Sequence, residues 1–141
     1  MLMTNPPVVG AGDSALDQRL SDELDTFNAA ATPEVEPAQE LTVRIEEDGE
    51  LLAGLSGWTW GQAAGIGMAW VHPEHRRSGH GSALLAAFED EARRRGSTHV
   101  FVTSFTFQAP DFYQRHGYQE TFRWDAVPTP GHDDVHMRKD L

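Results

Sequence analysis

The chain has 141 residues, which suits one domain with a core of moderate size, and 39% of them are hydrophobic and 23% charged, as in globular proteins. It contains no cysteine, which excludes disulfides, thiolate catalysis and cysteine-ligated metal sites. The formal net charge is -11 at pH 7, and such an acidic chain is a poor general binder of nucleic acid, because that binding requires basic side chains to neutralise phosphates.

The acidic side chains are concentrated in the first half of the chain. Residues 1–60 contain 12 acidic and 2 basic residues, whereas residues 61–141 contain 10 acidic and 9 basic residues. This asymmetry either serves solubility or lets the first half attract a cationic acceptor. No apolar run is long enough to span a bilayer, and the first residues lack the basic and apolar regions of a signal peptide, so we expect a cytoplasmic location.

The first half of the chain predicts one helix followed by three strands. Residues 1–13 are expected to form a flexible end, and apolar residues at helical spacing then predict a helix over residues 15–30. After a loop, alternating patterns and turn residues predict a β-meander. Its strands cover residues 41–45, 51–60 and 66–71, with turns at Asp48-Gly49 and at residues 61–65.

The second half predicts two helices and three further strands. Three acid-before-base pairs at i,i+4 spacing support the long helix, and they are Glu89/Arg93, Asp90/Arg94 and Glu91/Arg95. The elements are a helix over residues 82–95, a strand over 99–105, a short helix over 109–116, and strands over 118–124 and 135–139. This order indicates an α/β (α+β) fold with a mixed sheet, in a single domain over residues 1–141.

A basic, glycine-containing loop joins the third predicted strand to the long helix. Gly79 and Gly81 let the backbone turn sharply and approach a ligand closely. The first N–H groups of the helix point into this loop beside Arg76 and Arg77, which predicts a site for phosphate or pyrophosphate. For the Gly-x-Gly pattern alone, an ordinary strand-to-helix connection is the alternative.

Two motifs, separated by a helix and a strand, resemble those of the GNAT acyltransferase superfamily. The first is Arg76-x-x-Gly79-x-Gly81, and the second is the segment Phe107–Tyr118, which is similar to A-x-x-x-(F/Y)Y-x-x-x-G-(F/Y). The chain resembles in particular a subgroup of small bacterial GNAT proteins. The features shared with that subgroup are Trp70-Val71, a Phe-Gln-Ala-Pro-x-Phe-Tyr segment at residues 107–113, Pro130-Gly131-His132 and Arg138-Lys139.

This resemblance, which covers residues 15–141, implies a splayed central sheet that binds acetyl-CoA as a cosubstrate and no metal. The pantetheine arm would pair with the main chain at Trp70 and Val71, because divergence of strands leaves backbone groups unpaired. The pyrophosphate would meet the loop and the start of the helix. The residues implied there are Arg76, Arg77, Ser78, Gly79, His80, Gly81 and Ser82.

The resemblance also implies that Tyr113 is the general acid that protonates the departing thiolate. The general base is less clearly marked, because the strand at residues 66–71 contains no carboxylate, in contrast to many family members. His72, just beyond that strand, is the candidate base, and a chain of water molecules is the alternative. Trp58 and Trp60 project to one sheet face, where they either line the acceptor pocket or belong to the core.

These residues predict an N-acetyltransferase in which a primary amine of a small molecule or peptide attacks acetyl-CoA directly. The first alternative, motivated by the missing carboxylate, is a non-catalytic acyl-CoA-binding or sensing module. The second is an interaction protein that binds another anion at the loop. We expect no nucleic-acid or membrane partner, and edge strands near the C-terminus favour a homodimer.

Overall fold

The structure is a computed structural model that describes residues 5–141. The chain divides after Pro37 into two units, of which the second extends over residues 38–141. Part of the predicted flexible end, residues 1–4, lies outside the described residues, and residues 5–12 form neither helix nor strand. In the part of the chain that is described, no helix has the length and apolar character needed to cross a membrane.

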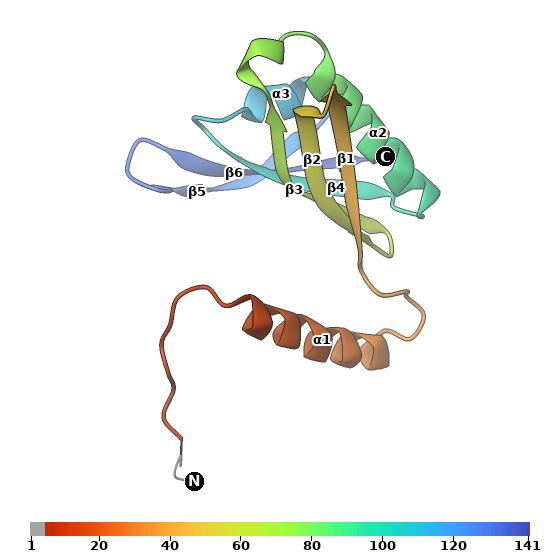
Figure 1. The fold of residues 1–141 in the computed structure, drawn as a ribbon, viewed down its shortest axis with the longest axis vertical. Helices are drawn as coiled ribbons and strands as arrows, with labels where there is room; N and C mark the ends of the chain where they lie inside the picture. The colour runs from red at the N-terminus through yellow and green to blue at the C-terminus, as the bar shows by residue number, and fades with distance from the viewer. Residues whose placement is uncertain (1–4) are drawn as a thin grey trace. The chain divides into compact units, whose positions relative to one another are not determined.

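The first unit contains the helix α1 (Ser14–Ala31), which confirms the first predicted helix (Figure 1). The side chain of Asp13 caps this helix, since its carboxylate accepts hydrogen bonds of 3.0 Å from the backbone N–H groups of Ala15 and Leu16. Such a cap satisfies donors that a helix end otherwise leaves free.

The second unit is a six-stranded mixed sheet with two helices packed against it (Figure 1). The strands lie in the order β1-β2-β3-β4-β6-β5; β3 and β4 are parallel, and the other neighbours are antiparallel. The predicted α/β (α+β) fold with a mixed sheet is confirmed. The elements are β1 (Gln39–Glu47), β2 (Glu50–Trp60), β3 (Ala63–Val71), α2 (His80–Arg94), β4 (His99–Phe105), α3 (Pro110–Arg115), β5 (Gln119–Asp125) and β6 (Asp133–Asp140).

β3 begins earlier than predicted, because one glycine was interpreted as a turn residue. The turn ends before Ala63, and Gly65 lies inside the strand. A Cβ atom on Gly65 would lie 2.3 Å from the ring of Trp58, its partner on β2. Glycine is therefore needed here for the close approach of a cross-strand ring and not for a turn.

β3 separates from β4 about halfway along its length. The parallel pairing ends at Ile66, opposite Val102, and the remainder of β3 as far as Val71 pairs with β2 alone. At the same point the register between β2 and β3 shifts, which leaves Gly67 as the extra residue of a β-bulge. Because a bulge bends its strand, it turns β3 away from β4 and splays the sheet, as predicted.

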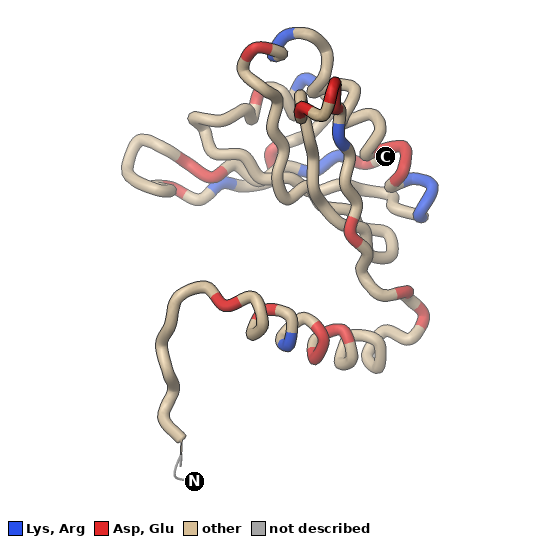
Figure 2. Tube along the Cα trace, in the orientation of Figure 1, with Lys and Arg blue, Asp and Glu red and all other residues tan. Residues whose placement is uncertain are grey.

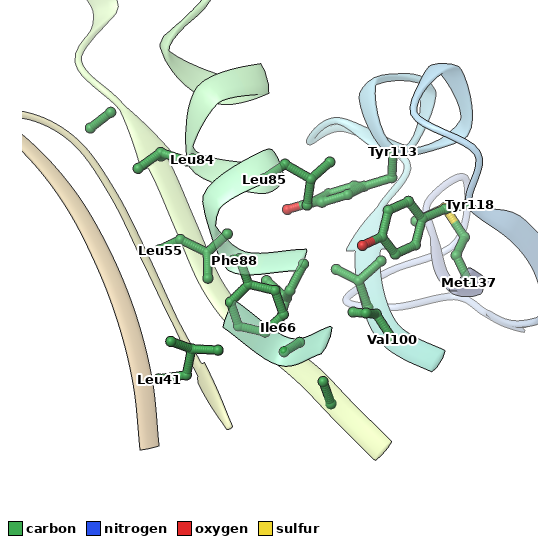
Figure 3. Close-up of a cluster of buried hydrophobic side chains, with 14 of the residues drawn as sticks. Leu41, Leu55, Ile66, Leu84, Leu85, Phe88, Val100, Tyr113, Tyr118 and Met137 are labelled. Atoms are coloured by element: carbon green, nitrogen blue, oxygen red, sulfur yellow. The ribbon is translucent and has the colours of Figure 1, made fainter. Parts of the chain in front are cut away.

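The hydrophobic core lies between the sheet and the two helices. α2 packs against β1, β2 and β3, and α3 contacts β4. Figure 3 shows Leu85 and Phe88 of α2 beside Ile66 of β3 and Val100 of β4. The largest fully buried side chains are Tyr118, Phe88, Leu85, Met137, Val100 and Val135.

One acidic residue of α2 faces this core, so the predicted pair Glu89/Arg93 is wrong. Glu89 is 6% exposed, and its carboxylate accepts hydrogen bonds from the Tyr118 hydroxyl at 2.8 Å and from Lys139 Nζ at 2.9 Å. Arg93 instead pairs with Asp90 at 3.0 Å. A carboxylate that loses water on burial requires such partners, whereas exposed neighbours on the helix do not supply them.

The predicted pair Asp90/Arg94 is also absent from the described residues, and the predicted pair Glu91/Arg95 forms with an N–O distance of 3.5 Å. Arg94 contacts Glu91 at i,i+3 instead, at 3.1 Å. Because i,i+3 and i,i+4 neighbours are both within reach on a helix, exposed pairs exchange partners at little cost.

Candidate active site

A cleft of about 870 Å³ opens where β3 and β4 diverge. Its walls are the second half of β3, the loop that follows, the first turn of α2, the end of β4 and one side of α3. Thr103 of β4 and Met68 of β3 border it, as do Leu85 and Tyr113 from the helices. The divergence of the two strands thus produces both the volume and a stretch of β3 that has no partner on β4.

The first turn of α2 borders this cleft with free backbone donors. Gly79 is the N-cap, with φ 87°, and no side chain caps the helix. The first bond of the helix runs from the Ala83 N–H to the Gly79 carbonyl at 3.0 Å, so within residues 5–141 the N–H groups of His80, Gly81 and Ser82 have no acceptor. Free donors at the positive end of a helix dipole form a site for an anion.

The two arginines of the loop also line the cleft. The Nε of Arg76 donates to the Val71 carbonyl at 3.0 Å, which ties the loop to the end of β3. Arg77 has φ 67°, and the Ser78 hydroxyl donates to the His75 carbonyl. The loop is therefore held by its own hydrogen bonds while both guanidinium groups remain exposed.

Gly81 allows α3 to approach the start of α2. A Cβ atom on Gly81 would lie 3.2 Å from the ring of Phe112 on α3. The sequence predicted glycine here for the approach of a ligand, and the structure adds a second requirement, which is the contact between the two helices.

A hydrogen bond between Ser82 and His116 joins the same two helices and was not predicted. The Ser82 hydroxyl lies 2.9 Å from His116 Nε2, and His116 Nδ1 lies 2.8 Å from the Phe112 carbonyl. Because a carbonyl only accepts, Nδ1 carries the proton and the neutral imidazole accepts from Ser82 at Nε2. His116 occupies an unspecified position of the second motif, so only its spacing from Phe112 on one helix face indicated this contact.

Most of the predicted cofactor-binding residues line one cleft, and two do not. Ser78 and His80 lie outside the cleft lining, with the Ser78 hydroxyl bonded inside the loop and the His80 ring 5.9 Å from that of His75. Phe112 and Arg115 of α3 line the cleft and were missed. The predicted residues in the lining are Trp70, Val71, Arg76, Arg77, Gly79, Gly81 and Ser82.

Tyr113 borders the cleft from α3 and is 7% exposed. Its ring packs edge-on against Phe112 and Tyr118, with centroid distances of 5.2 and 5.7 Å. Figure 3 shows the rings of Tyr113 and Tyr118 side by side. Within residues 5–141 its hydroxyl makes no hydrogen bond. Burial raises the pKa of Tyr113, so the phenol holds its proton more firmly than an exposed tyrosine does.

His72 does not line the cleft. Its Nδ1 accepts from the Glu74 N–H at 3.1 Å and caps the short 3-10 turn Pro73–His75, and its Nε2 lies 3.5 Å from Glu50. Both ring nitrogens therefore have partners outside the cleft. The predicted role of His72 as a base remains a prediction, and these contacts do not support it.

The charges around the cleft differ from those of the first unit. Figure 2 shows acidic residues recurring along α1 and a basic segment in the loop after β3. No group of three or more potential metal ligands occurs among the residues that the structure describes. The cleft therefore offers positive charge and backbone donors, which suit a phosphate-bearing ligand.

Comparison with known proteins gives a family match and one relative of known name. The family model described as the acetyltransferase (GNAT) family matches residues 11–118. Blasticidin-S acetyltransferase of Streptomyces morookaense is 42% identical over 79 residues, which are 55% of this chain and 58% of that protein. The alignment thus spans less than two thirds of that relative.

Two crystal structures have the same fold. An acetyltransferase of Bacillus cereus ATCC 14579 is 26% identical, with a TM-score of 0.78 over 96% of this chain and 98% of that chain. A protein of Agrobacterium tumefaciens is 23% identical, with a TM-score of 0.86 over 98% of this chain and 100% of that chain.

Proposed function

Because this chain belongs to the acetyltransferase (GNAT) family, we propose that it transfers the acetyl group of acetyl-CoA to an amine. The observation that supports this most directly is the cleft between β3 and β4, which joins free helix donors at one side to a buried tyrosine at another. A primary amine of a small molecule or peptide would attack the thioester carbonyl, and no acyl-enzyme is needed.

The residues of the cleft fit the parts of acetyl-CoA. The N–H groups at the start of α2 and the guanidinium groups of Arg76 and Arg77 would hold the pyrophosphate. The backbone of β3 beyond Ile66, including Trp70 and Val71, has no partner on β4 and would pair with the amide groups of the pantetheine arm.

In this proposal Tyr113 is the general acid. As the C–S bond breaks, its hydroxyl would give a proton to the thiolate sulfur. Its position at the cleft favours this role, and a phenol carries its proton at neutral pH; burial, which raises the pKa of Tyr113, makes it a weaker acid.

The identity of the acceptor is open to direct test. The name of the Streptomyces morookaense relative makes blasticidin S the first amine to assay. The formal net charge of -11 leads us to propose that cationic amines are preferred, because an acidic protein attracts cations over long range. An acceptor screen in which anionic or apolar amines react best would contradict this preference.

Two measurements on the full chain test the function. Calorimetry with CoA asks whether the cleft binds the cosubstrate, and thiol release from acetyl-CoA across a panel of amines asks whether the acetyl group is transferred. Binding with no transfer to any amine would favour the non-catalytic acyl-CoA-binding module, and absence of binding would reject both. We also propose a cytoplasmic location for the chain. Because β5 is an exposed edge strand, we further propose a homodimer, whose mass light scattering would measure.

A further inference from the structure

A histidine on β6 lies beside the cleft on the face of the sheet away from α2. Thr103 lines the cleft, and His136 is its direct cross-strand partner. Val102 and Met137, the neighbours that face the core, are both buried, so Thr103 and His136 share the opposite face. Directly paired side chains have Cβ atoms about 4.5–5.5 Å apart. The imidazole of His136 is therefore one strand away from the cleft wall.

Asp134, two residues earlier on the same face, orients this imidazole. His136 Nε2 lies 3.1 Å from Asp134 Oδ2. An ionised carboxylate only accepts hydrogen bonds, so Nε2 of the neutral ring carries the proton and Nδ1 keeps its lone pair. Within residues 5–141, Nδ1 of His136 makes no hydrogen bond. The arrangement presents a basic nitrogen whose tautomer is set by a neighbouring carboxylate.

The other carboxylate oxygen of Asp134 lacks a partner. Oδ1 is buried and has no hydrogen bond among the described residues. Leaving such an acceptor without a donor is costly, so a functional role or a bound water or ion is needed to explain it. A protonated amine, or a water molecule bound to such an amine, could donate a hydrogen bond to Oδ1.

The surroundings of His136 leave Asp134 as its nearest charged neighbour. Its cross-strand partners are the uncharged Thr103 on β4 and Phe122 on β5, whose ring lies 4.7 Å away. On β6 the next residue of this face is Arg138, which bonds to Asp140 at 2.9 Å. The side chain of His136 is 31% exposed and that of Asp134 is 19% exposed, so the imidazole remains accessible to a substrate.

We propose that His136 is the general base of the transfer reaction and that Asp134 is its positioning residue. The inference rests on the proposed function. The amine nitrogen forms a bond to the thioester carbonyl carbon while Nδ1 of His136 takes its proton. The C–S bond breaks with its electron pair on sulfur, which receives the Tyr113 proton. Solvent then removes the proton from His136 and restores that of Tyr113, so the net products are the amide and CoA.

His136→Gln tests the base, because glutamine fills similar space and cannot take up a proton at neutral pH. We expect kcat/KM for the amine to fall by ~10²–10⁴-fold, the typical contribution of a general base, with an unchanged Kd for CoA. His99→Gln is the matched control. His99 lies on the same sheet face of β4 as Thr103, but at the end where β4 still pairs with Ala63 of β3 and away from the cleft wall, so this variant should retain full activity.

Asp134→Asn provides a second, independent measurement. The amide oxygen still accepts from Nε2, but the negative charge beside the imidazole is lost. If Asp134 acts through the imidazole, this change should lower kcat in the parent and have no further effect in the His136→Gln background. A variant that merely loosened the fold would lower activity in both backgrounds.

The outcomes separate the inference from the function on which it rests. If the parent chain turns over an amine and His136→Gln does so equally well, the inference is overturned while the proposed function stands. If Asp134→Asn leaves kcat unchanged, or lowers it by the same factor in the parent and in the His136→Gln background, the positioning role is overturned. If the parent binds CoA but acetylates no amine, the proposed function fails and the inference fails with it.

Discussion

The substitution Tyr113→Phe separates chemistry from stability in this fold. It removes one hydroxyl and keeps the ring between Phe112 and Tyr118. Because that hydroxyl makes no hydrogen bond within residues 5–141, its loss should leave the free energy of unfolding almost unchanged. If the hydroxyl protonates the thiolate, kcat should fall by ~10²–10⁴-fold, with little change in KM for acetyl-CoA.

Tyr118→Phe is the matched control, because it makes the same change in the adjacent ring. Tyr118 is 2% exposed, and its hydroxyl donates to Glu89 at 2.8 Å. Its removal leaves the buried carboxylate with Lys139 as its remaining partner. Hydrogen bonds to charged groups contribute about 1.5–3 kcal/mol, so the free energy of unfolding should fall by that amount while kcat remains near the parent value.

The assay combines steady-state thiol release with denaturant unfolding of both variants. We expect Tyr113→Phe to have a low kcat and the stability of the parent, and Tyr118→Phe to have the kcat of the parent and a lower stability. A near-normal kcat in Tyr113→Phe would make this residue a packing aromatic. A fall of kcat and stability together in Tyr113→Phe would mean that its hydroxyl supports the site through contacts that the structure does not contain.

Three further predictions concern the loop and the buried phenols. Arg76→Ala should raise the KM for acetyl-CoA. The difference in KM from the parent should shrink at high salt, because screening weakens the phosphate contact in the parent as well. KM values equal to those of the parent at all salt concentrations would refute the contact. Gly79→Ala should weaken CoA binding measured by calorimetry and lower the free energy of unfolding by ~1–2 kcal/mol, because alanine is strained at φ 87° although the space around it is open. Gly96→Ala, at φ 94° and outside the cleft, is the control and should lower the free energy of unfolding alone. Burial and the neighbouring Glu89 raise the pKa of Tyr118 above its ordinary value, so the unfolded chain loses this proton first and stability should fall above pH ~10; unfolding titrations should show a shallower fall for Tyr118→Phe.

Local sequence patterns predicted the elements well, because each element bears its own periodicity. The strand at residues 99–105 was predicted with its exact bounds, and the loop between β3 and α2 was placed correctly. Gly65 shows the limit of this reasoning. Its requirement is the ring of Trp58 on another strand, and a non-local contact of this kind leaves no trace in the local pattern.

Glu89 illustrates the same limit for charges. Its spacing to Arg93 fits an exposed helical pair, and the preference for such pairs is only a few tenths of a kcal/mol. Burial against Tyr118 and Lys139 involves larger energies, and it depends on how β6 and the turn after α3 reach α2. The candidate base was missed for a similar reason, since only the register between β6 and β4 places His136 beside Thr103 of the cleft wall.

The residues proposed for cofactor binding and those proposed for proton transfer lie on different elements. The groups proposed for the pyrophosphate belong to the loop after β3 and to the start of α2, whereas Tyr113 is on α3 and His136 is on β6. The loop, the start of α2 and Tyr113 line one cleft, which opens where the bulge at Gly67 turns β3 away from β4, and His136 lies one strand from its wall. Variants of the loop should therefore alter Kd or KM for the cosubstrate, and variants of α3 and β6 should alter kcat. A variant that changes both KM and kcat without losing stability would indicate that cofactor binding and chemistry are coupled. The hydrogen bond between Ser82 and His116 is the contact through which α2 and α3 would transmit that coupling.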